Sequence, residues 1–331
     1  MKLFYLLLVL VFSGVSLFSQ SITNVKFRQE GSKIEITYNL QSEMAMEIEV
    51  FCSTDGGKTF GEALKSVSGD AGSGIQAGSN KKIIWDVLKD NDMLYSEQIA
   101  FKVTGSVNYV GEMIYVEGGT FQMGCTSEQN NCGDDEKAHS VTLSSFYIGK
   151  YEVTQKQWRD IMEANPSKFN DCDNCPVEQV SWNDIQDFLQ RLNAKTGKKY
   201  ILPTEAQWEY AARGGNKRKG YLYSGSNNID DVAWYSSNSG SKTHPVGQKK
   251  SNELNIYDMT GNVWEWCSDW YDEKYYKNSP ANNPQGVNSG SYRVYRGGSW
   301  DLEARYCRVA IRDLNYPDYR FSIGLRLAFV P

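Results

Sequence analysis

Cysteine is the residue type in this sequence with the widest chemical range, because a thiolate can bind a soft metal, attack a substrate or form a disulfide. Six of the seven cysteines form three candidate groups along the chain: Cys125 and Cys132 around a polar loop, Cys172 and Cys175 in a CxxC, and the distant Cys267 and Cys307. The seventh, Cys52, lies in a strand pattern. We expect three disulfides and one buried free thiol, with the connectivity left open. Zinc held by the two close pairs is the alternative, although the gap of Cys125 to Cys132 is unusual for a zinc knuckle.

The first residues predict the compartment in which these thiols react. Lys2 gives a positive start, residues 3–12 form an apolar run, and small residues follow as far as Ser19. This pattern is typical of a signal peptide, so residues 1–19 are expected to be cleaved and the protein to be secreted or periplasmic. An uncleaved anchor is the alternative reading. Disulfides form and persist in such an oxidising compartment.

Composition excludes two classes of partner. The net charge of -5 offers no basic face of the kind that nucleic acid binding calls for. The apolar run at the start is too short for a spanning helix, and no later stretch reaches the required length, so no transmembrane segment is expected. Abundant aromatic residues, 13% of the chain, suit a loop-rich body and a recognition surface.

The elements that must position the side chains fall into two regions. Residues 20–108 contain short apolar runs separated by Gly, Ser and Asp, which predicts a small all-β, immunoglobulin-like sandwich. Ile34, Ile36 and Tyr38 alternate along one strand of it. This region holds no cluster of titratable residues and is expected to act as a spacer or docking module.

Residues 109–331 have a different texture, with three capped helices followed by a long irregular stretch. The helices are expected to open at Thr154, Ser181 and Thr204, because each is followed three residues later by Gln, Asp and Gln in the capping-box pattern. Beyond Gly215 we expect no helix. Such a length stays folded only if rings, polar networks, ions or disulfides hold it.

Seven segments identify a family resemblance over residues 112–331. They are "MIYVEGGTFQMG", "FYIGKYEVTQKQW", "PVEQVSWNDI", "LPTEAQWEYAARGG", "YDMTGNVWEWCSDWY", "RVYRGGSW" and "IGLRLAF". In this order they resemble the formylglycine-generating enzyme, or sulfatase-modifying factor, superfamily. The resemblance implies an α+β, irregular C-type-lectin-like fold. The superfamily includes copper-dependent oxidases that convert a sulfatase cysteine to formylglycine, iron-dependent sulfoxide synthases, and binding proteins without catalysis, so the fold alone does not give the function.

The resemblance also implies where the oxidase thiols would lie. In the family two thiolates five residues apart follow a Gly-Gly-Ser-aromatic turn, here residues 297–300, and soft sulfur ligands hold Cu(I). The second position is Cys307, but the first is Leu302, which cannot bind copper. Ser299 and Tyr306 match family positions near the active site and are retained as catalytic candidates with Cys307. Copper is therefore not expected, and the same matched segments favour a structural Cys267–Cys307 disulfide.

Two further metals remain as alternatives. The family's calcium site maps onto the side chains of Asp258 and Glu265 and the carbonyls of Gly261 and Val263, an oxygen-only set of the kind calcium binds. The same carboxylates could instead cap turns or pair with arginine. An iron site of two histidines and one carboxylate would need both His139 and His244, which are expected to be hydrogen-bonding residues instead.

The C-terminal segment is expected to carry the binding surface. Six arginines lie between residues 296 and 326, and the family resemblance implies that several are buried against acidic residues such as Glu205, Glu209 and Glu265. A basic ligand cleft is the alternative. A ligand-binding groove is predicted from mixed aromatic and short polar residues: Trp300, Asp301, Leu302, Glu303, Asp313, Asn315, Tyr316, Tyr319 and Phe321. Together these features predict a secreted, non-catalytic protein that binds an unknown protein or small ligand, or serves cell-envelope machinery. A metal-dependent oxidoreductase that modifies sulfatases or another substrate is the alternative, and a receptor diversified within residues 300–322 is a third.

Overall fold

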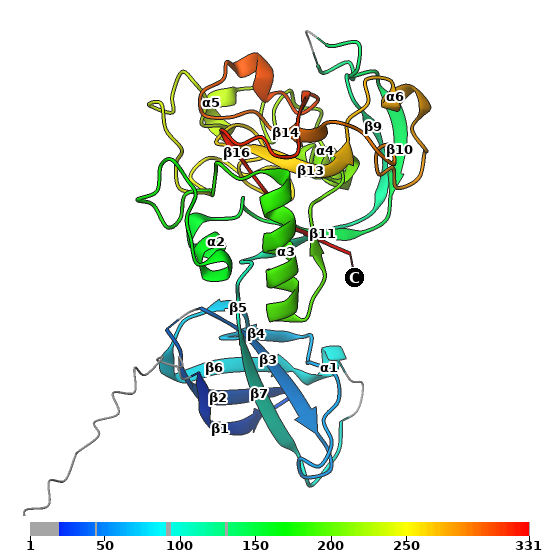
Figure 1. Cartoon of the computed structure of the whole chain (residues 1–331). Coiled ribbons are helices and arrows are strands. Elements are labelled where there is room, and N and C mark those ends of the chain that lie inside the picture. Colours follow the sequence, from blue (N-terminus) through cyan, green and yellow to red (C-terminus); the bar gives the residue numbers. More distant parts are fainter. Residues whose placement is uncertain (1–19, 44, 91–93, 130–131, 331) are drawn as a thin grey trace, which may run out of the picture. The chain divides into compact units, whose positions relative to one another are not determined.

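The structure is a computed structural model that describes residues 20–43, 45–90, 94–129 and 132–330 (Figure 1). The predicted signal peptide, residues 1–19, lies outside the described residues. The chain divides into two compact units, and the boundary between them lies between residues 108 and 109. As expected, the structure is α+β in class, with many short strands and few helices.

The N-terminal unit consists of two sheets around one apolar core. Its elements are β1 (Ser21–Glu30), β2 (Lys33–Gln41), β3 (Met46–Ser53), β4 (Val67–Gly69), β5 (Gly72–Ile75), β6 (Gly78–Asp86), α1 (Val87–Asp90) and β7 (Ala100–Val107). One sheet has the order β1-β2-β6-β4 and the other β5-β3-β7. Ile36, Val50 and Trp85 from β2, β3 and β6 share the core. The immunoglobulin-like assignment remains a prediction.

The alternation read from the sequence is visible in β2, where Ile34, Ile36 and Tyr38 are all buried. Cys52 is a free thiol, as predicted, but it is half-buried rather than buried. It lies on β3 at a hollow lined also by Phe60 and Trp85, so its side chain is not closed in by a second layer.

The C-terminal unit contains three small sheets. Its strands are β8 (Met113–Val116), β9 (Gly119–Met123), β10 (His139–Leu143), β11 (Phe146–Gly149), β12 (Tyr200–Ile201), β13 (Trp264–Trp270), β14 (Arg293–Arg296), β15 (Arg312–Asn315), β16 (Ile323–Gly324) and β17 (Ala328–Phe329). The sheets have the orders β10-β9, β12-β17-β11-β8 and β15-β14-β13-β16. The last one joins strands far apart in the sequence and positions the predicted groove.

The three predicted helices are α2 (Gln155–Met162), α3 (Trp182–Thr196) and α4 (Glu205–Ala212). Thr154, Ser181 and Thr204 cap them with complete capping boxes, as the sequence predicted. The helix α3 ends at Gly197, whose φ of 69° is left-handed.

The expectation of no helix beyond residue 215 was wrong in detail. Four short turns occur there: η1 (Gly215–Lys217), α5 (Ile229–Val232), α6 (Tyr275–Asn278) and η2 (Ala304–Cys307). Each is three or four residues long, too short for a 3.6-residue periodicity to appear in the sequence.

Buried ion pairs hold the irregular half of this unit together, as predicted for the arginines. Arg296 bridges Glu205 and Glu209 at 2.7 and 2.6 Å, and Arg312 also binds Glu205 at 2.7 Å. Another buried pair joins Arg308 to Glu136, a carboxylate that the sequence reading had not named. Since all these groups are removed from water, each charge depends on its partner.

Candidate functional site

The turn at Gly297 and Gly298 positions the thiol candidate. Gly298 has a φ of 79°, and an added Cβ would lie 2.5 Å from the Sγ of Cys307. Only glycine lets the chain pass so close to the sulfur. The Ser299 backbone N–H donates to this sulfur, and the Ser299 hydroxyl donates to Asp301 at 2.6 Å. The structure thus brings Ser299, Asp301 and Cys307 together. Tyr306, which directly precedes Cys307 in the sequence, is partly exposed.

Cys307 is fully buried and therefore a protonated thiol. Burial raises its pKa to about 12, and the N–H of Ser299 only partly offsets that effect. A thiolate is the form that binds metal and attacks a substrate, so Cys307 is held in its unreactive form. Leu302 packs against a different apolar cluster from the one that contains Cys307, and it contributes no sulfur.

The predicted Cys267–Cys307 disulfide was wrong, because both residues are free and buried. Cys267 lies on β13 in the cluster of Phe121 and Val294, whereas Cys307 lies in a separate cluster with Tyr223 and Val232. The other two predicted disulfides are confirmed: Cys125–Cys132 and Cys172–Cys175.

Several predicted groove residues gather around Tyr295 on β14. Antiparallel pairing of β14 with β15 sets Asp313 directly opposite Tyr295. Burial raises the pKa of Asp313, although the backbone N–H of Leu314 and the Tyr295 hydroxyl favour its charged form. Asn315 also bonds the Tyr295 hydroxyl, and Tyr319 lies near it. The structure thus gathers Asp313, Asn315 and Tyr319 around a buried tyrosine that the sequence reading had not named.

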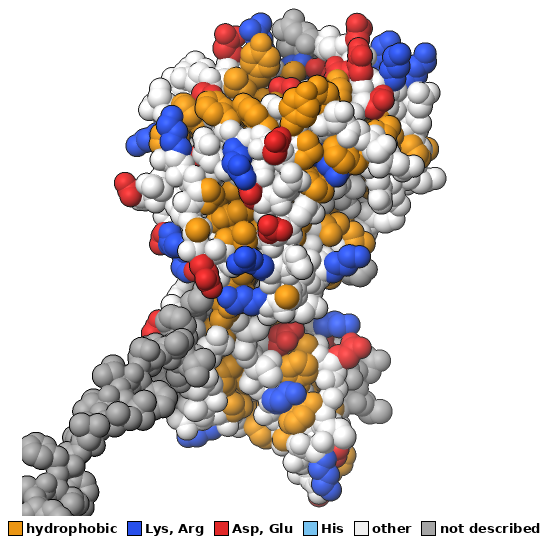
Figure 2. Space-filling view, viewed as in Figure 1, with side chains coloured by type: hydrophobic (Ala, Val, Ile, Leu, Met, Phe, Trp, Pro, Cys, Tyr) orange, Lys and Arg blue, Asp and Glu red, His pale blue; other side chains and the backbone are white. Residues whose placement is uncertain are grey.

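Exposed aromatic rings make up the rest of this surface, which we call the aromatic face. Its large exposed side chains are Tyr316, Tyr319 and Phe321, between 38% and 54% exposed. Hydrophobic side chains gather over the β13–β14 region in the view of Figure 2. The segment is anchored to α3 and the residues before it, because Arg320 binds Asp184 through two bonds and Gln179 donates to the Phe321 carbonyl.

Trp300 and Glu303 make contacts of their own. The Trp300 ring packs edge-on against Phe169, and its buried indole N–H has no hydrogen-bond partner among the residues that the structure describes. Glu303 pairs with Arg305 at 3.1 Å. None of the predicted groove residues lines the hollows of about 670 and 680 Å³ in the described part of the chain.

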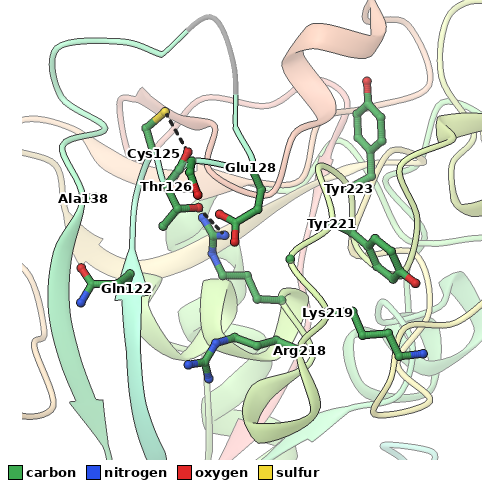
Figure 3. A pocket seen from close by; sticks show the side chains of 13 residues that line it. Gln122, Cys125, Thr126, Glu128, Ala138, Arg218, Lys219, Tyr221 and Tyr223 are labelled. Atoms are coloured by element: carbon green, nitrogen blue, oxygen red, sulfur yellow. Dashed lines mark hydrogen bonds between the residues drawn. The ribbon is translucent and has the colours of Figure 1, made fainter.

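Sequence reasoning missed the hollow of about 670 Å³ in the C-terminal unit. Figure 3 shows Gln122 and Ala138 from β9 and the segment before β10 on one side, and Tyr221 and Tyr223 on the other. Its basic residues come from one short run, residues 213–219, in which four of seven residues are Lys or Arg. That local charge density was the signal that could have identified it.

The predicted calcium residues lie in a buried acidic region around a single arginine. Arg326 binds both carboxylate oxygens of Glu265, at 2.7 and 3.0 Å, and Trp208 donates to the same group. Asp258 accepts the Gly247 N–H at 2.6 Å, and burial raises its pKa to about 6. A third carboxylate, Glu152, is fully buried, and its pKa is raised well above the usual range by burial and by Asp258.

This region fits a cation by charge. Burial raises the pKa values of Glu152 and Asp258, and the charge of Arg326, which is paired with Glu265, only partly offsets that effect. Gly261 has a φ of 77°, and a side chain there would collide with the Trp234 carbonyl. Glycine therefore allows the tight loop that carries the Gly261 and Val263 carbonyls.

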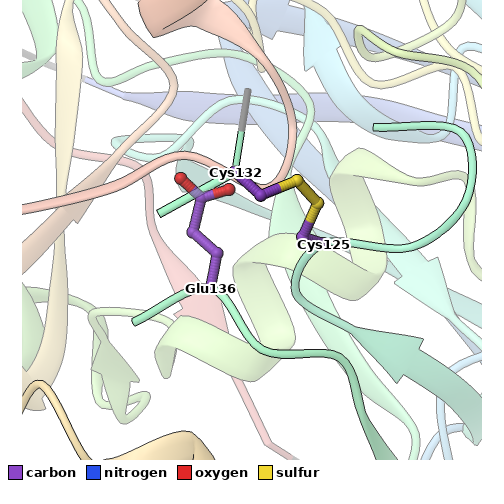
Figure 4. A group of neighbouring side chains, drawn as sticks. All are labelled: Cys125, Cys132 and Glu136. Carbon is purple, nitrogen blue, oxygen red and sulfur yellow. A yellow bond between two sulfur atoms is a disulfide. The ribbon is translucent and has the colours of Figure 1, made fainter. Parts of the chain in front are cut away.

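Other metal arrangements find little support. Among the described residues, the only group of three His, Cys, Asp or Glu ligand atoms within 4.8 Å of one another is Cys125, Cys132 and Glu136 (Figure 4). Its two sulfurs are joined to each other, and Glu136 binds Arg308. The His139 ring packs at a tilt against Tyr276, and the His244 ring stacks on Trp234. Each histidine also forms a hydrogen bond with a backbone carbonyl, so both act as packing and hydrogen-bonding residues.

The fold, with its three small sheets and long irregular half, is that of the formylglycine-generating enzyme superfamily. The chain belongs to the sulfatase-modifying factor enzyme 1-like domain family, which it matches over residues 101–330. Solved structures agree: Treponema denticola variable protein 1 is 34% identical with a TM-score of 0.61, covering 66% of this chain and 95% of that one. PvdO from Pseudomonas aeruginosa is 26% identical with a TM-score of 0.59, covering 65% and 93%.

Characterised relatives carry different names. The chaperone protein LppX of Paenibacillus barcinonensis is 37% identical, over 68% of this chain and 90% of that protein. The formylglycine-generating enzyme of Streptomyces coelicolor is 39% identical, over 47% of this chain and 52% of the enzyme. In the described part of the chain no helix has the length and apolar character to cross a membrane.

Proposed function

We propose that this chain is an exported, non-catalytic binding protein that holds another protein or a small ligand on its aromatic face during cell-envelope assembly. The observation that carries the proposal is the state of the remaining thiol. Cys307 is fully buried with a pKa raised to about 12, and Leu302 supplies no second sulfur. A Cu(I) centre needs soft ligands that are deprotonated, so the oxidase chemistry lacks its ligand set here.

The aromatic face supports a binding role. Tyrosine and other rings are enriched where proteins bind partners, because they offer a large contact area at a low entropic cost. Tyr316, Tyr319 and Phe321 are exposed, although many other aromatic side chains of the same unit are buried in its apolar core. Arg320 and Asp184 hold the segment in place, so the face is preorganised before a partner arrives.

The relatives support both this proposal and its alternative. The match to the chaperone protein LppX covers 90% of that protein, which favours a role in assisting another protein. Formylglycine-generating enzymes favour the alternative, a metal-dependent oxidoreductase that modifies sulfatases or another substrate. A receptor diversified within residues 300–322 is a third candidate, favoured by the match to a protein named as variable, and it requires sibling genes that differ only in that segment.

A paired assay separates binding from catalysis. Purified protein is loaded with copper, and oxygen consumption is measured with a cysteine-containing sulfatase peptide. We expect no turnover, and the same result for Cys307→Ser. Copper-dependent oxidation by the wild type that disappears in Cys307→Ser would overturn the proposal.

A second experiment tests the face itself. A photo-reactive residue in place of Tyr319 should cross-link one defined partner in cells, and this product should disappear when Tyr316 and Phe321 are also changed to alanine. Tyr115→Ala is the matched control, because Tyr115 is 52% exposed and lies on β8, outside the aromatic face. Equal cross-linking in both variants would place the binding surface elsewhere.

Export is part of the proposal and has its own test. Cleavage after Ser19 predicts a mature protein that begins at Gln20. N-terminal sequencing of protein from the envelope or medium should find this residue. An intact N-terminus on cytoplasmic protein would contradict export.

A further inference from the structure

A basic hollow in the C-terminal unit, distinct from the aromatic face, has no role in the proposed function. It measures about 670 Å³, within the range of small-molecule sites. Its wall carries three cationic residues, Arg213, Arg218 and Lys219, against one carboxylate, Glu128. Among the described residues neither Lys219 nor Arg218 forms a salt bridge, and Arg218 donates a hydrogen bond to the Gly215 carbonyl at 3.4 Å.

Arg213 gives the hollow a fixed charged group. Its side chain is only 7% exposed, and Glu209 holds its Nε at 2.8 Å. Its Nη1 donates to Thr126 and its Nη2 to the Gly124 carbonyl. A guanidinium has five N–H donors, so two of them remain after these three bonds.

The buried network behind Arg213 has an excess of positive charge. Three guanidiniums, those of Arg213, Arg296 and Arg312, share the two carboxylates of Glu205 and Glu209. The nearby Asp269 does not balance the excess below neutral pH, because burial raises its pKa to about 7. An anion in the hollow would balance this charge where water is partly excluded.

Glu128 already occupies part of the hollow. Figure 3 shows its carboxylate pointing inward between Gln122 and Tyr221. Thr126 bonds it, and the charges of Arg213 and Arg218 help to lower its pKa. It rests against Gly220, where an added Cβ would lie 2.9 Å from its Oε1. The chain's own carboxylate thus lies where an oxyanion would be attracted.

We propose that this hollow binds a small organic oxyanion, a phosphate or carboxylate, through Arg213, Arg218 and Lys219, and that Glu128 competes with the ligand for these cations. Planar guanidinium groups suit both kinds of oxyanion. The hollow is larger than a lone phosphate, and the partly exposed Tyr221 on its wall offers apolar surface for the rest of the molecule. This site is independent of the aromatic face.

Titration calorimetry with inorganic phosphate at constant ionic strength tests the proposal, and succinate serves as the carboxylate probe. We expect saturable binding of at least one probe. Arg218→Ala and Lys219→Ala should each weaken it about two- to fivefold, and Glu128→Gln should strengthen it by about the same factor. Arg213 is left unchanged because it holds a buried ion pair. Stronger binding of phosphate or of succinate identifies the oxyanion.

Lys217→Ala is the matched control, since Lys217 is exposed, lies in the same basic run and does not line the hollow. It should bind both probes like the wild type. Absence of saturable binding, or equal loss in Lys217→Ala and Lys219→Ala, would overturn the site. Unchanged affinity in Glu128→Gln would overturn the competition by Glu128.

Discussion

Arg296 donates from Nη2 to Oε2 of Glu209 at 2.6 Å, and both side chains are completely buried. The same guanidinium reaches Glu205 through Nη1 at 2.7 Å and the Val309 carbonyl through Nη2. One side chain on β14 therefore connects two turns of α4 to the segment that follows Cys307. The α4 helix and the C-terminal strands are held in register by charge as well as by apolar packing.

This arrangement predicts unequal effects for the same substitution at two arginines. Arg296→Met removes one of the two arginines bound to each of Glu205 and Glu209, and Arg312 and Arg213 remain as their partners. Breaking a buried ion pair costs up to about 3–5 kcal/mol. Arg320→Met removes a pair whose arginine side chain is 52% exposed, where the cost is about 1 kcal/mol or less. Urea unfolding of both variants measures the difference. Similar midpoints for the two would show that the buried network is not stabilising.

The free state of Cys267 and Cys307 leads to a thiol count. In denaturant the protein should show three reactive thiols, those of Cys52, Cys267 and Cys307. In the native state the two buried thiols should react far more slowly than the half-buried Cys52, because reagent cannot reach them, although burial raises the pKa of all three thiols. Alkylation followed by mass spectrometry checks both statements. A single thiol in denaturant would restore the Cys267–Cys307 disulfide.

The sequence predicted best the features that depend on residues close together in the chain. A capping box needs only residues three apart, so Thr154, Ser181 and Thr204 could be assigned as helix starts without knowing the fold. The partners of Arg296 and Arg312 followed from the family resemblance. That of Arg308 did not, because Glu136 is 172 residues away in a loop with no distinctive pattern.

The remaining features could not be predicted, because they depend on which distant segments the folded chain brings together. Cys267 and Cys307 lie on either side of the Gly297–Gly298 turn in the sequence, yet their side chains enter separate apolar clusters, which spacing cannot reveal. The basic hollow joins residues 122–138 to residues 213–225, and only the folded chain brings them together. The raised pKa of Asp269 has the same origin, since burial in tertiary structure causes it.

Asp269 predicts a pH dependence of stability. Burial raises its pKa from 3.8 to about 7, so the folded state keeps a proton that the unfolded chain releases near pH 4. Its contribution is therefore present at low pH and is lost as the pH rises from about 4 to 7. Asp269→Asn should gain stability relative to the wild type over this range, by up to about 4 kcal/mol at 1.4 kcal/mol per pKa unit.

The variant keeps the necessary acceptor, because one amide oxygen can take the bonds from the Glu205 N–H and the Ser268 hydroxyl. Unfolding free energies of both proteins at several pH values measure the difference. Asp318→Asn removes an exposed carboxylate and is the control, with a constant offset from the wild type expected. A constant offset for Asp269→Asn as well would contradict the assignment.

Calcium remains a proposal that the acidic region around Asp258 makes testable. A bound cation would neutralise Glu152 and Asp258, whose charges Arg326 offsets only in part, with the carbonyls of Gly261 and Val263 completing an oxygen-only site. Chelation by EGTA should then lower the melting temperature of the wild type. At a free calcium level of 100 times the Kd, the loss corresponds to about 2.7 kcal/mol.

The informative variant is Asp258→Asn rather than a change at Glu265. Glu265 binds both Arg326 and Trp208, so Glu265→Gln would weaken a buried ion pair whether or not calcium is present. Asp258→Asn should melt at the same temperature with calcium and with EGTA, while Asp318→Asn should respond like the wild type. The wild-type response should also shrink below about pH 6, since burial raises the pKa of Asp258 to about 6 and protons then compete with the cation. Equal responses of Asp258→Asn and the wild type to EGTA would rule out this site.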